Sequence, residues 1–148
     1  MRQSMLISLA SVVCLCAAAH AEPGGISIGI SAPLTGEAAT YGTDIKNSIE
    51  FANQQIAGGK YRLIAEDDKC SGKDAATVAH KLTEIDKVSG VLGFGCSGAL
   101  LAAAPIYERA KTVVIDAGGS APAISQAGDY IFRTVPSDTI SASVLYAY

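Results

Sequence analysis

A glycine-rich segment near the middle of the chain, Gly93-Phe94-Gly95-Cys96-Ser97-Gly98, has residue types suited to cofactor chemistry. Glycines at this spacing, between a strand and a helix, let the backbone approach the pyrophosphate of a dinucleotide. That fingerprint belongs to the first strand of its fold, however, whereas this segment follows the third predicted strand. Cys96 also stands at one of the variable positions and is expected to pair with Cys70. We therefore predict no cofactor at this segment.

The same segment contains Gly95-Cys96-Ser97-Gly98-Ala99, which differs only at its last position from the nucleophile elbow of α/β-hydrolases. In those enzymes the histidine of the triad follows the serine in the chain. Here His80 precedes Ser97, and no histidine comes after it. A secreted hydrolase fragment that uses Ser97 is the enzymatic alternative, and it would need a histidine from further chain.

Three consecutive acidic residues, Glu66-Asp67-Asp68, could hold a cation through oxygen ligands. They follow a predicted strand directly, and carboxylates at the end of a strand that enters a polar loop are usually solvated. His80 is interpreted as a surface residue as well. We therefore expect neither a metal site nor a catalytic residue in this chain.

The remaining interpretation is non-catalytic binding. A helix that begins at Ser97 and Gly98 presents free backbone amides and the positive end of its dipole, which suit a carboxylate. Ser120 adds a hydroxyl beside Gly118 and Gly119, whose carbonyls could accept hydrogen bonds from an ammonium group. Together these groups suit a zwitterion and supply no catalytic base. The alternative is a loop whose residues are small only because the chain packs tightly there.

The elements that must position these residues alternate between strand and helix. Apolar runs predict strands at 26–30, 61–65, 91–94, 112–115 and 130–134. Helical spacing predicts helices at 45–56, 71–85 and 97–110 and another from 137, and Pro105 should kink the third helix or delay its start. This order predicts an α/β fold with a three-layer, doubly wound parallel sheet and right-handed crossovers. Ligands of such sheets lie beyond the carboxyl ends of the strands, where the residues above are found.

The first 21 residues are predicted to be a secretory signal peptide rather than part of the fold. Arg2 is followed by an uncharged apolar run from Met5 to Ala18 and by Ala19-His20-Ala21, a cleavage pattern. The run is too short for a transmembrane helix. Residues 22–148 are expected to form one domain. Acidic residues outnumber basic ones, fourteen to eleven, without any basic run, so nucleic acid and anionic membranes are poor partners.

Two cysteines remain once the signal is set aside, Cys70 and Cys96. In a chain bound for an oxidising compartment, such a pair predicts a disulfide. A metal site is the alternative, but it lacks ligands, because His80 is the only histidine in this part of the chain and there is no C-x-x-C motif.

A series of segments along the chain resembles the leucine/isoleucine/valine-binding protein family. The segments are APLTG at 32–36, YG at 41–42, EDDKC at 66–70, CSG at 96–98, LAAAPIYE at 101–108 and FRTVPSD at 132–138. They occur in the family's order through nearly all of residues 22–148. The resemblance implies the N-terminal lobe of a type I periplasmic-binding-protein fold, in which two α/β lobes close over a ligand at a hinge.

The resemblance also implies roles for individual residues. Ser97 stands where the family holds the α-carboxylate of its ligand, and Tyr41 corresponds to an aromatic residue that borders the ligand. The stretch Gly118-Gly119-Ser120 replaces the family's Ala-Ala-Thr, which contacts the carboxylate and the ammonium. Cys70 and Cys96 match the disulfide pair of the family.

The chain departs from the family pattern in its loop and in its length. Asp116 stands where Thr or Ser is common, and the glycine pair is smaller than usual, so the resemblance leaves the exact ligand open. Family members are much longer, so we expect the second lobe to be absent, this chain alone to bind weakly or not at all, and an exposed sheet edge to favour self-association.

The function that the resemblance implies is that of a non-enzymatic periplasmic receptor. It would pass a branched-chain or related amino acid to the membrane permease of an ABC importer. A sensory or amide-regulator domain on the same fold is a further alternative.

Overall fold

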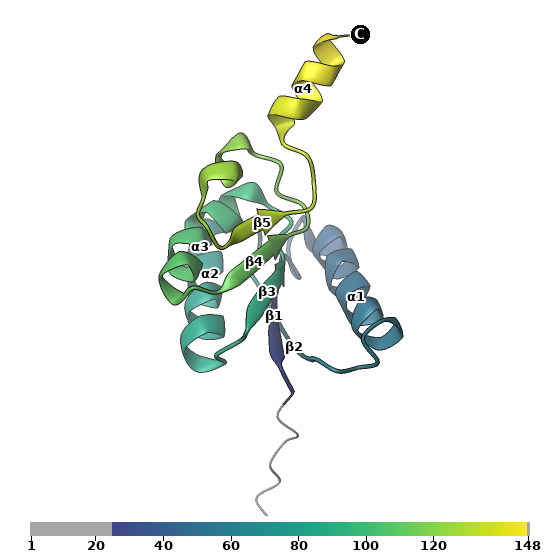
Figure 1. Cartoon of the computed structure of the whole chain (residues 1–148), viewed down its shortest axis with the longest axis vertical. Helices are drawn as coiled ribbons and strands as arrows, with labels where there is room; N and C mark the ends of the chain where they lie inside the picture. The colour runs from purple at the N-terminus through teal and green to yellow at the C-terminus, as the bar shows by residue number, and fades with distance from the viewer. Residues whose placement is uncertain (1–24, 148) are drawn as a thin grey trace, which may run out of the picture.

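Five parallel strands form the centre of the structure, a computed structural model that describes residues 25–147 (Figure 1). The strands are β1 (Ser27–Ala32), β2 (Arg62–Asp67), β3 (Gly90–Gly93), β4 (Val113–Asp116) and β5 (Ile131–Arg133). They lie in the order β2-β1-β3-β4-β5, and every neighbouring pair is parallel. The predicted α/β fold and its strands are confirmed, with strand ends shifted by one or two residues. The predicted signal peptide lies outside the described residues.

Helices cover both faces of this sheet. They are α1 (Ala39–Gln55), α2 (Gly72–His80), α3 (Ser97–Ala110) and α4 (Asp138–Tyr146), with a π-helical turn η1 (Lys81–Ile85) and a 3-10 helix η2 (Pro122–Gln126). In Figure 1, α2 and α3 lie on one side of the sheet and α1 on the other, while α4 projects from the body. Within the described residues, no helix is long and apolar enough to cross a membrane.

The first of the predicted helices begins earlier than expected, whereas the third has the predicted bounds. The first starts at Ala39, before the apolar spacing begins, because Gly42 lets the helix approach the carbonyl of Pro33 so closely that a Cβ atom would collide with it. The third runs from Ser97 to Ala110 without a delayed start at Pro105. Pro105 is exposed, so water can reach the helical carbonyl that the missing N–H leaves unpaired. The second helix is capped by Ser71, whose Oγ accepts a hydrogen bond from the Asp74 amide.

The hydrophobic core lies between the sheet and the α2–α3 layer. Its largest fully buried side chains are Leu82, Val91, Phe94, Leu100, Tyr107, Val114 and Ile124. The rings of Phe94 and Tyr107 meet edge to face with centroids 6.1 Å apart. Phe94 adopts a positive φ of 54° directly after β3, so its backbone turns while its side chain remains in the core.

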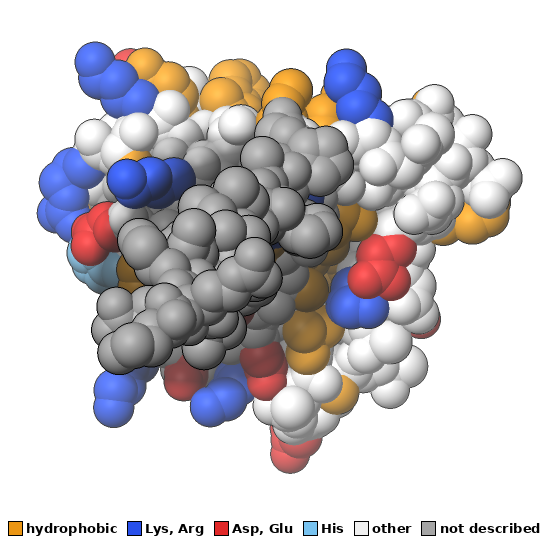
Figure 2. All heavy atoms as spheres, turned by 90° about the horizontal axis from the view of Figure 1, so that it is seen from below, with side chains coloured by type: hydrophobic (Ala, Val, Ile, Leu, Met, Phe, Trp, Pro, Cys, Tyr) orange, Lys and Arg blue, Asp and Glu red, His pale blue; other side chains and the backbone are white. Residues whose placement is uncertain are grey.

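The opposite face of the sheet is less completely covered. Between α1 and strands β1, β2 and β3 lies a hollow of about 510 Å³, lined mainly by apolar residues that include Ile28, Ile49 and Leu92. On β4 and β5 the side chains of Ile115 and Phe132 are 39% and 54% exposed. Figure 2 shows the molecule from below, with the side of α1 in Figure 1 again at the right. Apolar side chains are visible there between the centre and that side.

A disulfide joins the end of β2 to the start of α3. Cys70 and Cys96 are bonded, with their Cα atoms 5.4 Å apart and a sequence separation of 26, so the predicted pairing is confirmed. Cys70 itself has a positive φ of 57°, and Cys96 is the N-cap residue of α3. The bond therefore fixes the first turn of α3 against the loop that follows β2.

We expect the double variant Cys70→Ser, Cys96→Ser to lose about 3–4 kcal/mol of unfolding free energy, the entropic effect of opening a loop of this length. Urea denaturation of the oxidised wild type and of the variant measures the difference. Reductant should lower the stability of the wild type and leave the variant unchanged. Equal stability of the two oxidised proteins would show that the bond does not constrain the unfolded chain.

Candidate functional site

The candidate site is formed where the carboxyl ends of β1, β3 and β4 meet. Tyr41 lies in the first turn of α1, and its ring fills the space between two glycines of other loops. A Cβ atom on Gly95 would lie 2.8 Å from Tyr41 Cδ1, and one on Gly118 would lie 3.0 Å from Tyr41 Cε1. Both positions therefore require glycine for packing, which supports the alternative of a tightly packed loop for Gly118. Tyr41 remains 47% exposed and so borders the site.

Ser97 connects α3 to the loop that follows β4. Its Oγ accepts a hydrogen bond from the amide of Ala121 at 3.2 Å. Because the oxygen serves as the acceptor there, the hydroxyl proton of Ser97 remains available for donation to a ligand. Ser97 and Gly98 open the helix, and a Cβ atom on Gly98 would meet nothing within 4 Å. The N-terminus of α3 thus faces open space and can accommodate an anionic group.

The loop Gly118-Gly119-Ser120 is held from two sides. Asp116 Oδ1 accepts hydrogen bonds from the amides of Gly118 at 3.1 Å and Gly119 at 2.9 Å. On the other side, the guanidinium of Arg133 donates to the carbonyls of Ser120 at 3.3 Å and Ala121 at 3.0 Å. The loop conformation is therefore determined by the Asp116 carboxylate, which binds the glycine amides, and by the Arg133 guanidinium, which binds the carbonyls of Ser120 and Ala121.

The structure brings all five predicted ligand-binding residues to this edge of the sheet. Tyr41 packs against Gly118, and Ser97 bonds to the amide of Ala121, directly after the Gly118–Ser120 loop. The roles of the five residues as ligand contacts stay predictions, and the hollow described above lies elsewhere, under α1. Sequence reasoning missed Asp116 and Arg133 as organisers of the loop. An aspartate two or three residues before a glycine pair is the signal that was available, since Asp side chains commonly bond to amides two residues further on.

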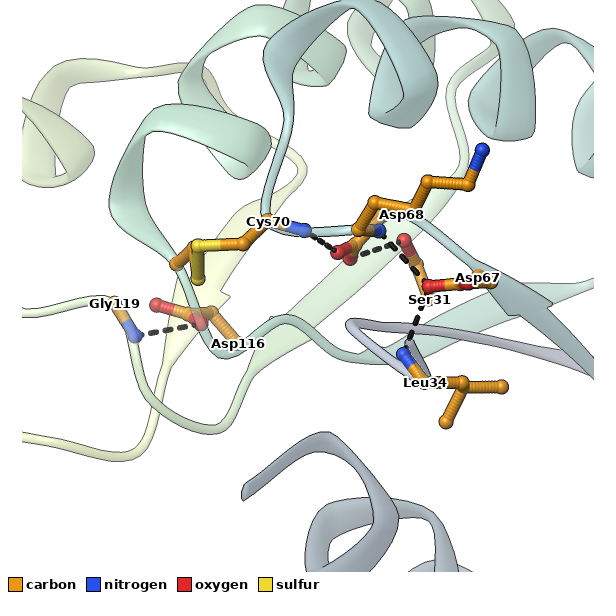
Figure 3. Close-up of a disulfide and its surroundings, with 9 residues drawn as sticks. Ser31, Leu34, Asp67, Asp68, Cys70, Asp116 and Gly119 are labelled. Carbon is orange, nitrogen blue, oxygen red and sulfur yellow. Dashed lines mark hydrogen bonds between the residues drawn. A yellow bond between two sulfur atoms is a disulfide. The ribbon is translucent and has the colours of Figure 1, made fainter. Parts of the chain in front are cut away.

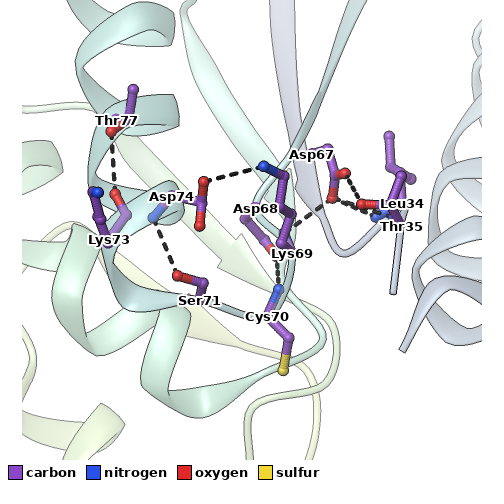
Figure 4. A network of polar contacts seen from close by, with 10 residues as sticks. All are labelled: Leu34, Thr35, Asp67, Asp68, Lys69, Cys70, Ser71, Lys73, Asp74 and Thr77. Atoms are coloured by element: carbon purple, nitrogen blue, oxygen red, sulfur yellow. Dashed lines mark hydrogen bonds and ion pairs between the residues drawn. The ribbon is translucent and has the colours of Figure 1, made fainter. Parts of the chain in front are cut away.

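The acidic segment after β2 has a structural role that the sequence did not indicate (Figure 4). Asp67 Oδ1 accepts the amides of Leu34 at 2.8 Å and Lys69 at 2.9 Å, and Asp67 Oδ2 accepts the hydroxyl of Thr35 at 2.5 Å. Asp68 is fully buried and accepts from Ser31 Oγ and from the Cys70 amide, both at 2.9 Å. The expectation of solvated carboxylates is therefore wrong. Among residues 25–147 no cluster of three or more His, Cys, Asp or Glu side chains is arranged to hold a metal ion.

The three aspartates at this edge differ in their pKa values. Burial raises the pKa of Asp68 and of Asp116 above the ordinary aspartate value, and the amide hydrogen bonds offset only part of this effect. For Asp67, partial burial also acts to raise the pKa, but the hydrogen bonds from Thr35, Leu34 and Lys69 together outweigh it and lower the pKa. Asp67 is thus the carboxylate whose ionised form stabilises the folded state.

The enzymatic alternative finds no support in the contacts of Ser97. His80 is exposed on α2, and its Nδ1 lies 2.6 Å from Glu84 Oε1. Within the described part of the chain, the hydrogen-bond partner of Ser97 Oγ is a backbone amide rather than a base. Among residues 25–147, therefore, no base is placed to activate the Ser97 hydroxyl for nucleophilic attack.

Residues 25–148 match the family described as periplasmic binding protein. An amino acid binding protein of Pseudomonas aeruginosa is 31% identical over 130 residues, which cover 84% of this chain and 34% of that protein. The leucine-specific-binding protein of Salmonella typhimurium is 29% identical over 146 residues, which cover 94% and 39%. The chain thus spans a little more than a third of the length of these relatives.

Solved structures of solute-binding proteins share the fold. One from an ABC transporter of Rhodopseudomonas palustris BisB5, in complex with 3,4-dihydroxybenzoic acid, is 32% identical with a TM-score of 0.70 and covers 76% of this chain and 32% of that one. The branched-chain amino acid substrate-binding protein LivJ of Streptococcus pneumoniae, in complex with isoleucine, is 26% identical with a TM-score of 0.74 and covers 78% and 35%.

The charge of Asp67 should contribute stability that depends on pH. Because its folded-state pKa is lowered, the contribution is complete above the ordinary aspartate value and is lost as the pH falls through the lowered pKa. We expect Asp67→Asn to reduce the unfolding free energy at neutral pH by about 1 kcal/mol. The difference should shrink at acidic pH, once the pH has fallen through the lowered pKa of Asp67 and both side chains are uncharged.

Urea denaturation of wild type and Asp67→Asn at the two pH values tests this expectation. Asp129→Asn changes an exposed aspartate and serves as the matched control. A difference between wild type and Asp67→Asn that is equally large at both pH values would contradict a role for the charge.

Proposed function

Because the chain belongs to the periplasmic binding protein family, we propose that it forms part of a receptor that delivers a small carboxylate solute to an ABC importer. A branched-chain amino acid is the first candidate ligand, and the importer's membrane permease is the partner. The family consists of binding proteins rather than enzymes, and for this chain we propose no catalytic step. The family is periplasmic, and the predicted signal at residues 1–21 would direct the chain there.

The observation that carries this proposal is the distribution of donors and acceptors around the candidate site. The free hydroxyl proton of Ser97 and the first amides of α3 lie at one side. At the other side are the carbonyls of Gly118 and Gly119, which accept no hydrogen bond from any described residue. A carboxylate at the α3 N-terminus and an ammonium group at the glycine carbonyls would complement both sides.

An aromatic carboxylate is a second candidate ligand. The relative at 32% identity binds 3,4-dihydroxybenzoic acid, whose hydroxyl groups can also donate to carbonyl oxygens. In this chain the glycine loop carries no side chain that would occupy the site, and the half-exposed ring of Tyr41 lies beside it. An aromatic ring could stack against Tyr41, with its carboxylate at Ser97.

Titration with leucine tests the proposed carboxylate site. Ser97→Ala should weaken binding by about 1–3 kcal/mol, the effect of losing a hydrogen bond to a charged group. Ser48→Ala is a matched control, because Ser48 Oγ bonds only to the Asp44 carbonyl within α1. NMR chemical shifts at millimolar ligand concentrations detect weak binding as well. Equal affinities of Ser97→Ala and wild type would exclude Ser97 as the carboxylate contact.

A parallel titration with 3,4-dihydroxybenzoate distinguishes the two ligand classes. If the chain is an amino-acid receptor, leucine should perturb the amide signals of Ser97 and Gly118 at a lower concentration than the benzoate does. The reverse order would identify an aromatic-acid receptor. Because this chain alone is expected to bind weakly or not at all, the titration is repeated with the chain extended to the length of its relatives, and a folded extended protein that responds to neither compound would contradict the proposed function.

A further inference from the structure

Asp116 is a fully buried carboxylate at the end of β4 whose hydrogen bonds are unequally distributed. Its Oδ1 accepts two amides, from Gly118 and Gly119, whereas its Oδ2 is buried without a partner among the described residues. Figure 3 shows the side chain below the Cys70 disulfide, with the dashed bond to the Gly119 amide. A buried charge with one unpaired oxygen is costly, so its position calls for an explanation.

We propose that Asp116 is a positioning residue that sets the polarity of the Gly118–Ser120 loop and thereby selects ligands that carry a hydrogen-bond donor beside their carboxylate. This inference rests on the proposed function and deepens it. The carboxylate binds the two glycine amides, so neither amide can donate to a ligand. Their carbonyls are left as acceptors toward the site.

Arg133 completes the arrangement from the opposite side of the loop. Its guanidinium takes the carbonyls of Ser120 and Ala121 and also donates to Ser125 Oγ at 2.5 Å. The carbonyls that lack a protein partner are therefore those of Gly118 and Gly119, the same two residues whose amides Asp116 binds. A ligand meets two acceptors there, with a negative charge behind them, so an ammonium or hydroxyl donor is favoured and a second carboxylate is repelled.

The position of Gly119 fixes this geometry sterically. A Cβ atom on Gly119 would lie 2.5 Å from Asp116 Oδ2 and 2.6 Å from Ile124 Cδ1. No side chain can therefore be placed at 119 while the carboxylate keeps its place. Gly119 and Asp116 therefore depend on each other. The absence of a side chain at Gly119 leaves room for the Asp116 carboxylate and its hydrogen bonds, and not only for a ligand.

Amide hydrogen exchange measured by NMR on the oxidised protein tests the positioning role without any ligand. The amides of Gly118 and Gly119 should exchange about 10 to 100 times faster in Asp116→Ala than in wild type, because hydrogen bonds to a charged group are lost. Asp116→Asn keeps an oxygen acceptor and should restore most of the protection. Asp129→Ala, at an exposed aspartate, should leave both amides as in wild type.

Ligand selectivity provides the readout that a purely structural role would not change. Leucine and 4-methylpentanoate differ only in the ammonium group, and we expect wild type and Asp116→Asn to prefer leucine. In Asp116→Ala the loop loses the two hydrogen bonds that fix the orientation of the glycine carbonyls, so the preference for leucine should fall at least about fivefold, since one changed hydrogen bond alters affinity by a factor of this order or more.

Unchanged exchange in Asp116→Ala, or unchanged selectivity after the amides are released, would overturn the proposal. If Asp116→Ala does not fold, the wild type decides, because glycine amides that exchange at the rate of free peptide amides would exclude the hydrogen bonds. If the wild type responds to neither compound even when it is extended to the length of its relatives, the proposed function and the selectivity are both refuted, while the exchange rates still decide whether Asp116 positions the loop.

Discussion

Parallel strands end at one edge of a sheet, and the loops that leave them carry backbone amides with no strand partner. In this protein aspartate carboxylates bind those amides. Asp67 accepts hydrogen bonds from amides of the loop after β1. Asp68 accepts one from the Cys70 amide after β2, and Asp116 accepts one each from Gly118 and Gly119 after β4. Each carboxylate fixes a loop from within the sheet edge, and the space between the loops is the candidate site. Without these bonds the glycine-rich segments would have no defined conformation in which to present donors and acceptors.

Much of the fold follows from local patterns, since apolar runs and helical spacing depend on residues near each other in the chain. The five strands were predictable in this way, and their order placed Ser97 and the glycine loop at one edge of the sheet. The disulfide was predicted from the number of cysteines left after the signal, and the place of Tyr41 only from the resemblance to the family. The early start of α1 was not, because it depends on the close approach of Gly42 to Pro33 rather than on any periodicity. The role of Asp68 was missed for a similar reason. The burial of Asp68 depends on a hydrogen bond from Ser31, which lies 37 residues earlier in the chain. In the sequence alone, a run of adjacent acidic residues indicates a solvated segment.

Packing and recognition are usually treated as competing explanations of small residues, but here they depend on each other. Gly118 is required because Tyr41 occupies the space of a side chain, and Gly119 because Asp116 does. The same two packing contacts leave the glycine carbonyls without protein partners and place an aromatic ring beside them. The energetic cost of burying Asp116 is offset by two amide bonds and by the nearby guanidinium of Arg133, which also lowers the pKa of the carboxyl against the effect of burial.

The strand order places the first strand of the chain between the second and the third. β1 pairs with β2 on one side and β3 on the other, so a chain emerging vectorially from its N-terminus leaves Ile28 and Ile30 unpaired until both later strands have arrived. During that interval the backbone groups of β1 that face a strand not yet made have no partner, a condition that favours aggregation. Cys96 follows β3, so it is made available only when the last partner of β1 is complete. The disulfide between Cys70 and Cys96 can therefore form only after the three strands at the centre of the sheet, β1, β2 and β3, have been synthesised.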